Sequence, residues 1–263
     1  MDASFERAIR RDARRARHIG TWYQDALALR LVVQGAALIL LGEWLILGGV
    51  ETHLVGVVGG VLLVGLGSHS FGILSHETFH LSLFSRARSN RIIGAFVFSY
   101  PFFGRYLRLR RTHFAHHRHV GSTEDPDHVA WCNNGRKAEW ARLVRVTLGV
   151  QHFNLDNSRS RTNQETSKES SRDLLGILGT QALILCTFGI FGKWFVYISG
   201  WVLPILTCGA LIEHLRVRTE HDNGDLIIFV SPGIVERVSF GFANFSLHAI
   251  HHLSPNTPWF ALG

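Results

Sequence analysis

Long apolar segments alternate with polar, basic ones along this chain. Four of the apolar segments are long enough to cross about 30 Å of hydrocarbon as a helix. They lie at about residues 31–50, 54–75, 174–192 and 194–212. Glu43 interrupts the first of them, and Pro204 is expected to kink the fourth. The pattern predicts an all-α integral membrane protein with about four transmembrane helices, organised as a single domain over residues 1–263.

The polar parts of the chain separate these spans. Residues 1–26 form a basic head, and 16 of the 27 Lys and Arg residues fall in the middle block that precedes the third span. A short apolar interval in this block, residues 92–104, contains a proline and predicts an interfacial or re-entrant segment. We expect a solvated loop at residues 157–173 and an amphipathic interfacial segment at residues 226–245.

The distribution of positive charge predicts an orientation in the membrane. The two short turns between paired spans, at residues 51–53 and at Lys193, contain a single basic residue. Basic residues concentrate instead in the head, in residues 76–173 and in residues 213–263. By the positive-inside rule, both termini and these two long polar parts lie on the cytoplasmic side. Every histidine cluster described below lies in or next to them.

Composition agrees with a multi-pass membrane protein. Hydrophobic residues make up 46% of the chain and charged residues only 18%, which is too apolar for an ordinary soluble domain. The net charge of +7 raises the alternative of nucleic-acid binding. Nucleic-acid binding does not require uncharged segments of about 20 residues, so we attribute the excess of basic residues to membrane topology and contact with anionic lipid. The three cysteines are too few and too scattered for a disulfide framework.

Histidine spacing carries the candidate chemistry. Eight of the 16 histidines form three boxes, each next to a predicted membrane boundary. The boxes are His76-x-x-x-His80, His113-x-x-His116-His117 and His248-x-x-His251-His252. Residues three and four apart share one face of a helix, whereas solvated imidazoles need no spacing rule.

The number of imidazoles predicts two metal ions. Eight ligands exceed what one ion with an open position accepts. Neighbouring residues on a helix point about 100° apart, so His116 and His117 could serve adjacent ions. Imidazole suits iron, zinc and copper alike, and spacing therefore does not name the metal.

The order of the boxes resembles the membrane fatty acid desaturase and hydroxylase superfamily, which includes acyl desaturases, alkane monooxygenases, and carotenoid ketolases and hydroxylases. Asp125-Pro126-Asp127 after the second box and Pro255-x-x-Pro258-Trp259-Phe260 after the third are also similar to that superfamily. The resemblance covers the chain from about residue 54 onward. It implies a cytoplasmic helical cap that carries the boxes and a non-haem centre of two iron ions that activates dioxygen. From the sequence itself, we expect no haem or flavin fused to the chain.

The resemblance also implies further residues around the metals. His221, preceded by Glu220, is expected as a ninth ligand, with His214 as the alternative on the same helical face. Some carboxylates are expected to hold the ligand imidazoles in orientation through hydrogen bonds. These are Glu77, Asp125, Asp127 and Glu220. The remaining histidines near the boxes are interpreted as solvated or supporting residues; they are His69, His119, His128 and His152.

The function implied is dioxygen-dependent desaturation of an unactivated C–C bond in a fatty acyl or other lipid-like substrate. Hydroxylation or ketolation is the alternative within the superfamily, because substrate placement decides the outcome. Electrons are expected from a separate ferredoxin, rubredoxin or cytochrome b5-like donor with its reductase, since the sequence contains no Cys-x-x-Cys.

A different class of enzyme matches part of the pattern. Residues His76 to His80 also fit H-E-x-x-H, the signature of zinc proteases in which the glutamate is the general base. An intramembrane zinc metalloprotease is therefore the main alternative, although it would leave both H-x-x-H-H boxes without a role. A histidine-rich metal carrier or a di-haem cytochrome would place histidines within the spans rather than at their ends.

Overall fold

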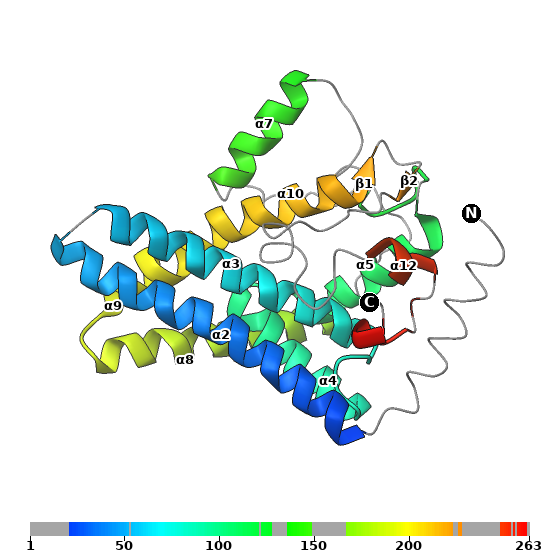
Figure 1. The fold of residues 1–263 in the computed structure, drawn as a ribbon, viewed down its shortest axis with the longest axis horizontal. Helices are drawn as coiled ribbons and strands as arrows, with labels where there is room; N and C mark the ends of the chain where they lie inside the picture. Colours follow the sequence, from blue (N-terminus) through cyan, green and yellow to red (C-terminus); the bar gives the residue numbers. More distant parts are fainter. Residues whose placement is uncertain are drawn as a thin grey trace.

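The computed structural model describes residues 21–52, 54–120, 122–127, 136–148, 167–222, 226–227, 248–253, 255 and 257–261. Within these residues, four helical segments are long and apolar enough to cross a membrane. They are Thr21–Gly48, Leu54–Phe79, Lys168–Ile190 and Trp194–Arg218. The predicted all-α membrane fold is confirmed, and Figure 1 shows these helices forming the elongated body of the molecule.

All four spans have boundaries that differ from the prediction, and the fourth extends from Trp194 to Arg218 rather than ending near residue 212. Helix α2 covers Thr21–Thr52 and so includes the last residues assigned to the polar head, of which residues 1–20 lie outside the described part. Helix α3, Leu54–Phe79, continues past residue 75 and carries His76. Helix α8 begins at Ser167 and extends to Ile190, so residues 167–173 are helical rather than a loop. Its polar first turns are stabilised by side-chain contacts with another helix, which local composition does not reveal.

Small residues bring α2 and α3 into close contact. A Cβ atom on Gly42 would lie 2.7 Å from the carbonyl oxygen of Gly60, and one on Gly67 would lie 3.0 Å from that of Gly35. Such a distance leaves no room for a side chain. Lipid is as apolar as a leucine side chain, so helices in a membrane associate through this kind of backbone packing.

The fourth span changes its helical geometry around Pro204. It begins as α9, Trp194–Val196, continues through two π-helical segments, Tyr197–Val202 and Ile205–Gly209, and ends as α10, Ala210–Glu220. Proline lacks the N–H that an α-helix needs at this point, and π-helical turns accommodate such an interruption. The irregularity expected from Pro204 therefore takes the form of π-helical turns on both sides of it.

A short helical segment packs against α3 where a re-entrant or interfacial segment was predicted. It consists of α4, Ala87–Ile93, the π-helix Gly94–Ser99 and the 3-10 turn Tyr100–Phe102. At its end, the Gln181 amide of α8 donates hydrogen bonds to the carbonyl oxygens of Tyr100 and Pro101, and the Tyr100 oxygen also accepts one from the backbone N–H of Phe103. A buried glutamine thus ties the end of this segment to α8.

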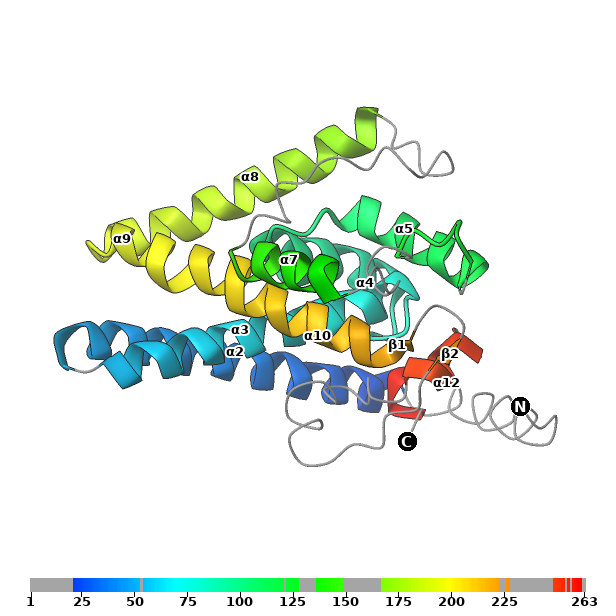
Figure 2. The same cartoon turned by 90° about the horizontal axis from the view of Figure 1, so that it is seen from above.

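Most of the remaining elements gather at one end of the bundle (Figures 1 and 2). Helix α5 covers Tyr106–His119 and α12 covers His248–Leu253, and both lie near the end of α3. Helix α7, Arg136–Thr147, packs along α10. A two-residue ladder pairs β1, His221–Asp222, with β2, Leu226–Ile227, and a 3-10 turn follows at Trp259–Ala261. Most of the segment predicted as amphipathic, residues 228–245, lies outside the described residues.

Candidate metal centre

Five histidines, four of them from helices α3, α5 and α12 and one from the turn after α3, converge at the end of α3. Their possible ligand nitrogens all lie within 4.8 Å of one another. The five are His76, His80, His113, His117 and His251, which we call the five-histidine group. The Nε2 atom of His80 lies 2.6 Å from that of His113 and 3.1 Å from that of His251, and the Nε2 atoms of His113 and His117 are 2.9 Å apart.

A second cluster, which we call the three-histidine group, contains the other members of the two H-x-x-H-H boxes. His116 of α5 meets His248 and His252 of α12. The Nε2 atoms are 3.3 Å apart between His116 and His252, and 2.9 Å apart between His252 and His248. Each box is therefore divided: its i, i+4 pair joins one group and its middle histidine joins the other. This division follows from the angle between neighbouring side chains on a helix.

The donor set of the five-histidine group fits a transition-metal ion. Burial, followed by the His117 imidazole and the Arg110 charge, lowers the pKa of His80 to about 3. Burial and the neighbouring His116 lower the pKa of His117 to about 4. The pKa values of His113 and His251 are also lowered by burial and by adjacent imidazoles. Imidazoles that stay neutral keep the lone pair that binds a metal, and their converging nitrogens give such an ion several ligands at once.

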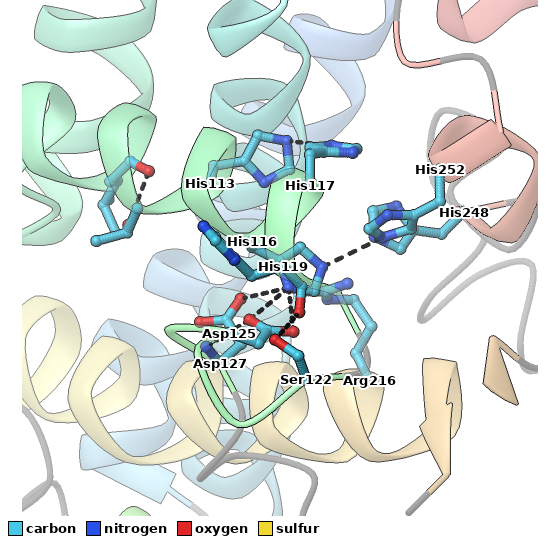
Figure 3. Close-up of polar contacts among 12 residues, drawn as sticks. His113, His116, His117, His119, Ser122, Asp125, Asp127, Arg216, His248 and His252 are labelled. Carbon is cyan, nitrogen blue, oxygen red and sulfur yellow. Dashed lines mark hydrogen bonds and ion pairs between the residues drawn. The ribbon is translucent and has the colours of Figure 1, made fainter. Parts of the chain in front are cut away.

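The buried carboxylate of Asp125 contacts His116, the α5 residue of the three-histidine group (Figure 3). Asp125 accepts a hydrogen bond from the Nδ1 side of His116, at 2.8 and 2.9 Å to its two oxygens. The backbone N–H of Asp127 in turn donates to Asp125, at 2.8 Å. Burial alone would lower the pKa of His116, but the hydrogen bond with Asp125 and the charges of Asp127 and Asp125 raise it above its usual value. With Nδ1 held in this way, Nε2 of His116 faces His252.

Two of the other three carboxylates that were expected to orient imidazoles, Glu77 and Asp127, differ in placement. Glu77 is buried, and its carboxylate lies 3.1 Å from Nδ1 of His76 and accepts a hydrogen bond from the Ser82 hydroxyl at 2.9 Å. Asp127 is half-exposed, and its carboxylate lies 3.8 Å from Nδ1 of His116. Glu77 and Asp125 are therefore in direct contact with an imidazole of the two histidine groups. Asp127 lies farther from His116 and faces solvent with half of its side chain.

The two candidates for the ninth ligand are separated by the end of α10. His214 is buried in α10, where its Nε2 atom lies 3.4 Å from a carboxylate oxygen of Glu139 in α7, and it belongs to neither histidine group. His221 follows α10 directly, but its side chain and that of Glu220 lie outside the described part of the structure. The assignment of His221 thus stays a prediction.

The remaining histidines lie apart from the two groups or outside the described residues. His69 is buried within α3, and its Nδ1 atom lies 3.0 Å from a carboxylate oxygen of Glu213 in α10. His119 lies at the end of α5 beside the exposed carboxylate of Glu124, at 3.1 Å. His128 and His152 lie outside the described residues.

Two contacts of this region had no counterpart in the sequence prediction. The first is the pair of His69 with Glu213, which also binds Arg216 through both carboxylate oxygens. The second is the buried carboxylate of Asp173 in α8, which contacts the start of α5. In each case the only signal in the sequence is an acidic residue inside or beside an apolar span, which marks an ionisable group with a partner but does not name it.

A bundle of four spanning helices carries eight clustered imidazoles at one end, a donor set that could hold metal ions in a membrane protein. The sequence model of the fatty acid desaturase family matches residues 51–263, and the chain belongs to this family. The resemblance seen in the histidine boxes is thereby confirmed, and the protein is an oxidoreductase of the desaturase and hydroxylase superfamily.

Individual relatives include both desaturating and ketone-forming enzymes. The chain is 26% identical over 226 residues to dihydrorhizobitoxine desaturase of Bradyrhizobium elkanii, an alignment that covers 77% of this chain and 64% of that protein. It is 29% identical over 222 residues to a β-carotene ketolase of Paracoccus sp. (strain PC1), covering 76% of each. A second β-carotene ketolase, from Paracoccus sp. (strain N81106 / MBIC 01143), is 28% identical over 205 residues, or 72% of this chain.

Proposed function

We propose that the protein is a dioxygen-dependent di-iron oxidoreductase that desaturates an unactivated C–C bond of a fatty acyl or other lipid-like substrate. The observation that carries this proposal is the division of eight imidazoles into two adjacent groups at one end of a membrane bundle. The family is a class of non-haem di-iron enzymes. The five-histidine group would hold one iron ion, and the three-histidine group, together with His221, would hold the other.

Bound iron would supply the redox chemistry with dioxygen. The protein residues would orient the metal ligands and exclude water from the site. Asp125 and Glu77 lie at the Nδ1 atoms of His116 and His76, which leaves Nε2 for the metal. The rings of Phe79 and Phe114 pack beside the five-histidine group, with centroids 5.7 Å from His113 and 5.2 Å from His80. These rings exclude water from one side of the site.

The place of the site in the fold supports a lipid-like substrate. His76 lies in the last turn of the spanning helix α3, and His80 follows the end of that helix. A substrate that is dissolved in the bilayer therefore reaches the metal groups along the apolar helices without crossing water. The position of the substrate relative to the metal groups then decides which C–H bond reacts.

The distribution of basic residues supports a membrane orientation and a kind of electron donor. We propose that both termini and the metal centre face the cytoplasm, because basic residues concentrate in the segments at that end. Electrons would arrive from a separate ferredoxin, rubredoxin or cytochrome b5-like donor with its reductase. The exposed Arg118 beside the second box is one of the positive charges that an acidic donor would meet.

Ketone formation is the second candidate function, and the relatives favour it specifically. The two β-carotene ketolases align over 76% and 71% of their own length, against 64% for the desaturase. Both outcomes start from oxidation of an unactivated C–H bond, so the same metal groups serve either. The distinction lies in the substrate and in the way it is held.

The arrangement around Glu77 argues against the zinc-protease alternative. The general base of such an enzyme must reach water on the metal side of its two histidines. The Glu77 carboxylate is buried, accepts a hydrogen bond from Ser82 and lies at the Nδ1 side of His76. Both H-x-x-H-H boxes also contribute to the metal groups, and a protease site would leave them without a role.

Metal analysis and product analysis test the proposal together. The full chain is purified from iron-replete cells, and lipids and small metabolites are compared by mass spectrometry in cells with and without it. We expect about two iron ions per chain and a product that has lost two hydrogens; a product with a carbonyl oxygen in place of two hydrogens would select the ketolase candidate. His116→Ala should abolish the product, whereas His119→Ala, outside both groups, should retain it. Two zinc ions without iron, or turnover by His116→Ala, would refute the proposal.

A further inference from the structure

Helix α5 is shared by both metal groups. Its residues His113 and His117 join the five-histidine group, while His116 joins the three-histidine group. At its middle, the Arg110 guanidinium donates a hydrogen bond to the carbonyl oxygen of Phe79 at the end of α3, at 3.0 Å. A displacement of α5 would therefore change the nitrogen positions in both groups at once.

The start of α5 is capped by a residue of another helix. The first N–H groups of a helix have no partner within it, and a side chain just before the helix usually accepts their hydrogen bonds. The residue in that place, Arg105, makes no such bond. Instead, the Asp173 carboxylate of α8 accepts hydrogen bonds from the backbone N–H groups of Leu107 and Arg108, each at 3.1 Å.

Asp173 is fully buried and has a third partner. Its side chain is 0% exposed, and it accepts a hydrogen bond from the Tyr100 hydroxyl at 3.1 Å. A buried carboxylate is costly unless its oxygens are hydrogen-bonded, and here both oxygens have donors. Its negative charge also lies at the positive end of the α5 dipole. The cap comes from a residue 65 or 66 positions away, so it fixes the place of α5 against α8 as well as the first turn of α5.

Two neighbours of Asp173 on α8 also contact α5 or the residue just before it. Glu169 forms an ion pair with Arg111 at 2.9 Å, and the Ser170 hydroxyl accepts a hydrogen bond from Arg105. We call Glu169, Ser170 and Asp173 the α8 clamp; they lie within two turns at the start of α8, which Figure 2 shows on the same side of the molecule as α5. Leucine-rich helix faces do not fix one position in lipid, because lipid chains solvate them equally well. The polar clamp supplies the specific position.

We propose that Asp173 is a positioning residue of the metal centre. It holds α5 in the position in which His113 and His117 meet His76 and His80 while His116 meets α12. This inference rests on the proposed function, because it assumes that the two histidine groups bind metal. Helix α8 contributes no histidine to either group, so the effect of Asp173 on metal binding must pass through α5.

Cobalt provides the test, because its visible absorption reports the geometry of its ligands. The purified full chain is loaded with Co(II), its absorption spectrum and melting temperature are recorded, and release of the metal to a chelator is timed. The variants are Asp173→Ala and the milder Asp173→Asn, in which an amide N–H must face a backbone N–H. The matched control is Gln181→Ala, since Gln181 lies on the same helix, is buried and has three hydrogen-bond partners, none of them in α5.

We expect both Asp173 variants to change the cobalt spectrum and to release metal faster than the unmodified chain, by about 10-fold if the loss matches the lower end of the effect of removing a group that supports a metal ligand. Gln181→Ala should lower the melting temperature and leave the spectrum and the release rate unchanged. An unchanged spectrum and rate in Asp173→Asn, or equal changes in Gln181→Ala, would overturn the positioning role while leaving the proposed function intact. If the unmodified chain bound no cobalt, zinc or iron, both proposals would fail.

Discussion

Replacing Asp125 with asparagine should weaken metal binding at one group and leave the other intact. The Asp125 carboxylate is buried and accepts a hydrogen bond from Nδ1 of His116 at 2.8 Å. This bond keeps the proton on Nδ1 and the lone pair on Nε2, which faces the three-histidine group. An asparagine amide can donate to Nδ1 instead, and the proton would then move to Nε2, where it blocks the metal.

The expected loss follows from the number of ligands affected. Removing an outer-shell partner typically costs 10–100-fold in metal affinity, or about 1.4 to 2.8 kcal/mol of binding free energy. Only one of the three described imidazoles in the three-histidine group contacts Asp125. The five-histidine group has none of its ligands bonded to this carboxylate and should retain its ion. Asp125→Asn therefore should hold about one metal ion per chain under conditions in which the unmodified chain holds two.

The assay is metal analysis of purified protein after equilibration with a graded series of chelator concentrations. Asp127→Asn is the matched control, because its carboxylate is half-exposed and lies 3.8 Å from Nδ1 of His116. It should cost less than Asp125→Asn at every chelator concentration. The reasoning would be refuted if Asp125→Asn retained both ions with unchanged affinity, or if it lost both together.

Three further predictions concern the ninth ligand, the helix packing and pH. His221→Ala should lose the ion of the three-histidine group only, and His214→Ala should lose neither; the opposite result in metal analysis would exchange their roles. Gly42→Leu should lower the melting temperature, at a cost of about 1–3 kcal/mol from overpacking, because its Cβ would collide with a backbone carbonyl oxygen of α3, whereas Gly72→Leu, where a Cβ meets nothing within 4 Å, should not. Burial lowers the pKa of His80 to about 3 in the folded protein, from the ordinary value of 6.5 in the unfolded chain. Between pH 6.5 and pH 3, the unfolded chain therefore binds more protons at this residue than the folded protein does. Stability of the metal-free protein is therefore complete above pH 6.5 and falls by about 1.4 kcal/mol per pH unit for this residue as pH decreases; equal melting temperatures at pH 7 and pH 5 would contradict this.

The spans and the histidine boxes could be predicted because both are local patterns. Hydropathy over about 20 residues identifies a spanning helix, and the i, i+3, i+4 spacing places imidazoles on one helix face. The angle between neighbouring side chains also indicated that His116 and His117 could serve adjacent ions, and the structure brings them into different groups. Local spacing does not determine which box meets which, since this depends on how α5 and α12 pack.

The contacts that the sequence did not reveal join residues far apart in the chain. Asp173 was assigned to a loop because the residues before it are polar, yet it caps a helix that begins 67 positions earlier. His69 was interpreted as a supporting residue, but its partner Glu213 lies on another span. A buried polar group must find a partner, so the existence of such contacts is predictable, but the identity of the partner depends on tertiary structure.

The unequal division of imidazoles bears on where a ninth ligand is needed. The H-x-x-H-H boxes on α5 and α12 each give two histidines to one group and one to the other, so together they supply three to each group. His76 and His80 add two more to one group, and the totals become five and three. An ion in the three-histidine group has fewer imidazoles than an octahedral or five-coordinate site would use. Helix α10 ends at Glu220, and His214 within it is engaged with Glu139. The residue that completes the smaller group should therefore come after this helix, which is where His221 stands in the sequence.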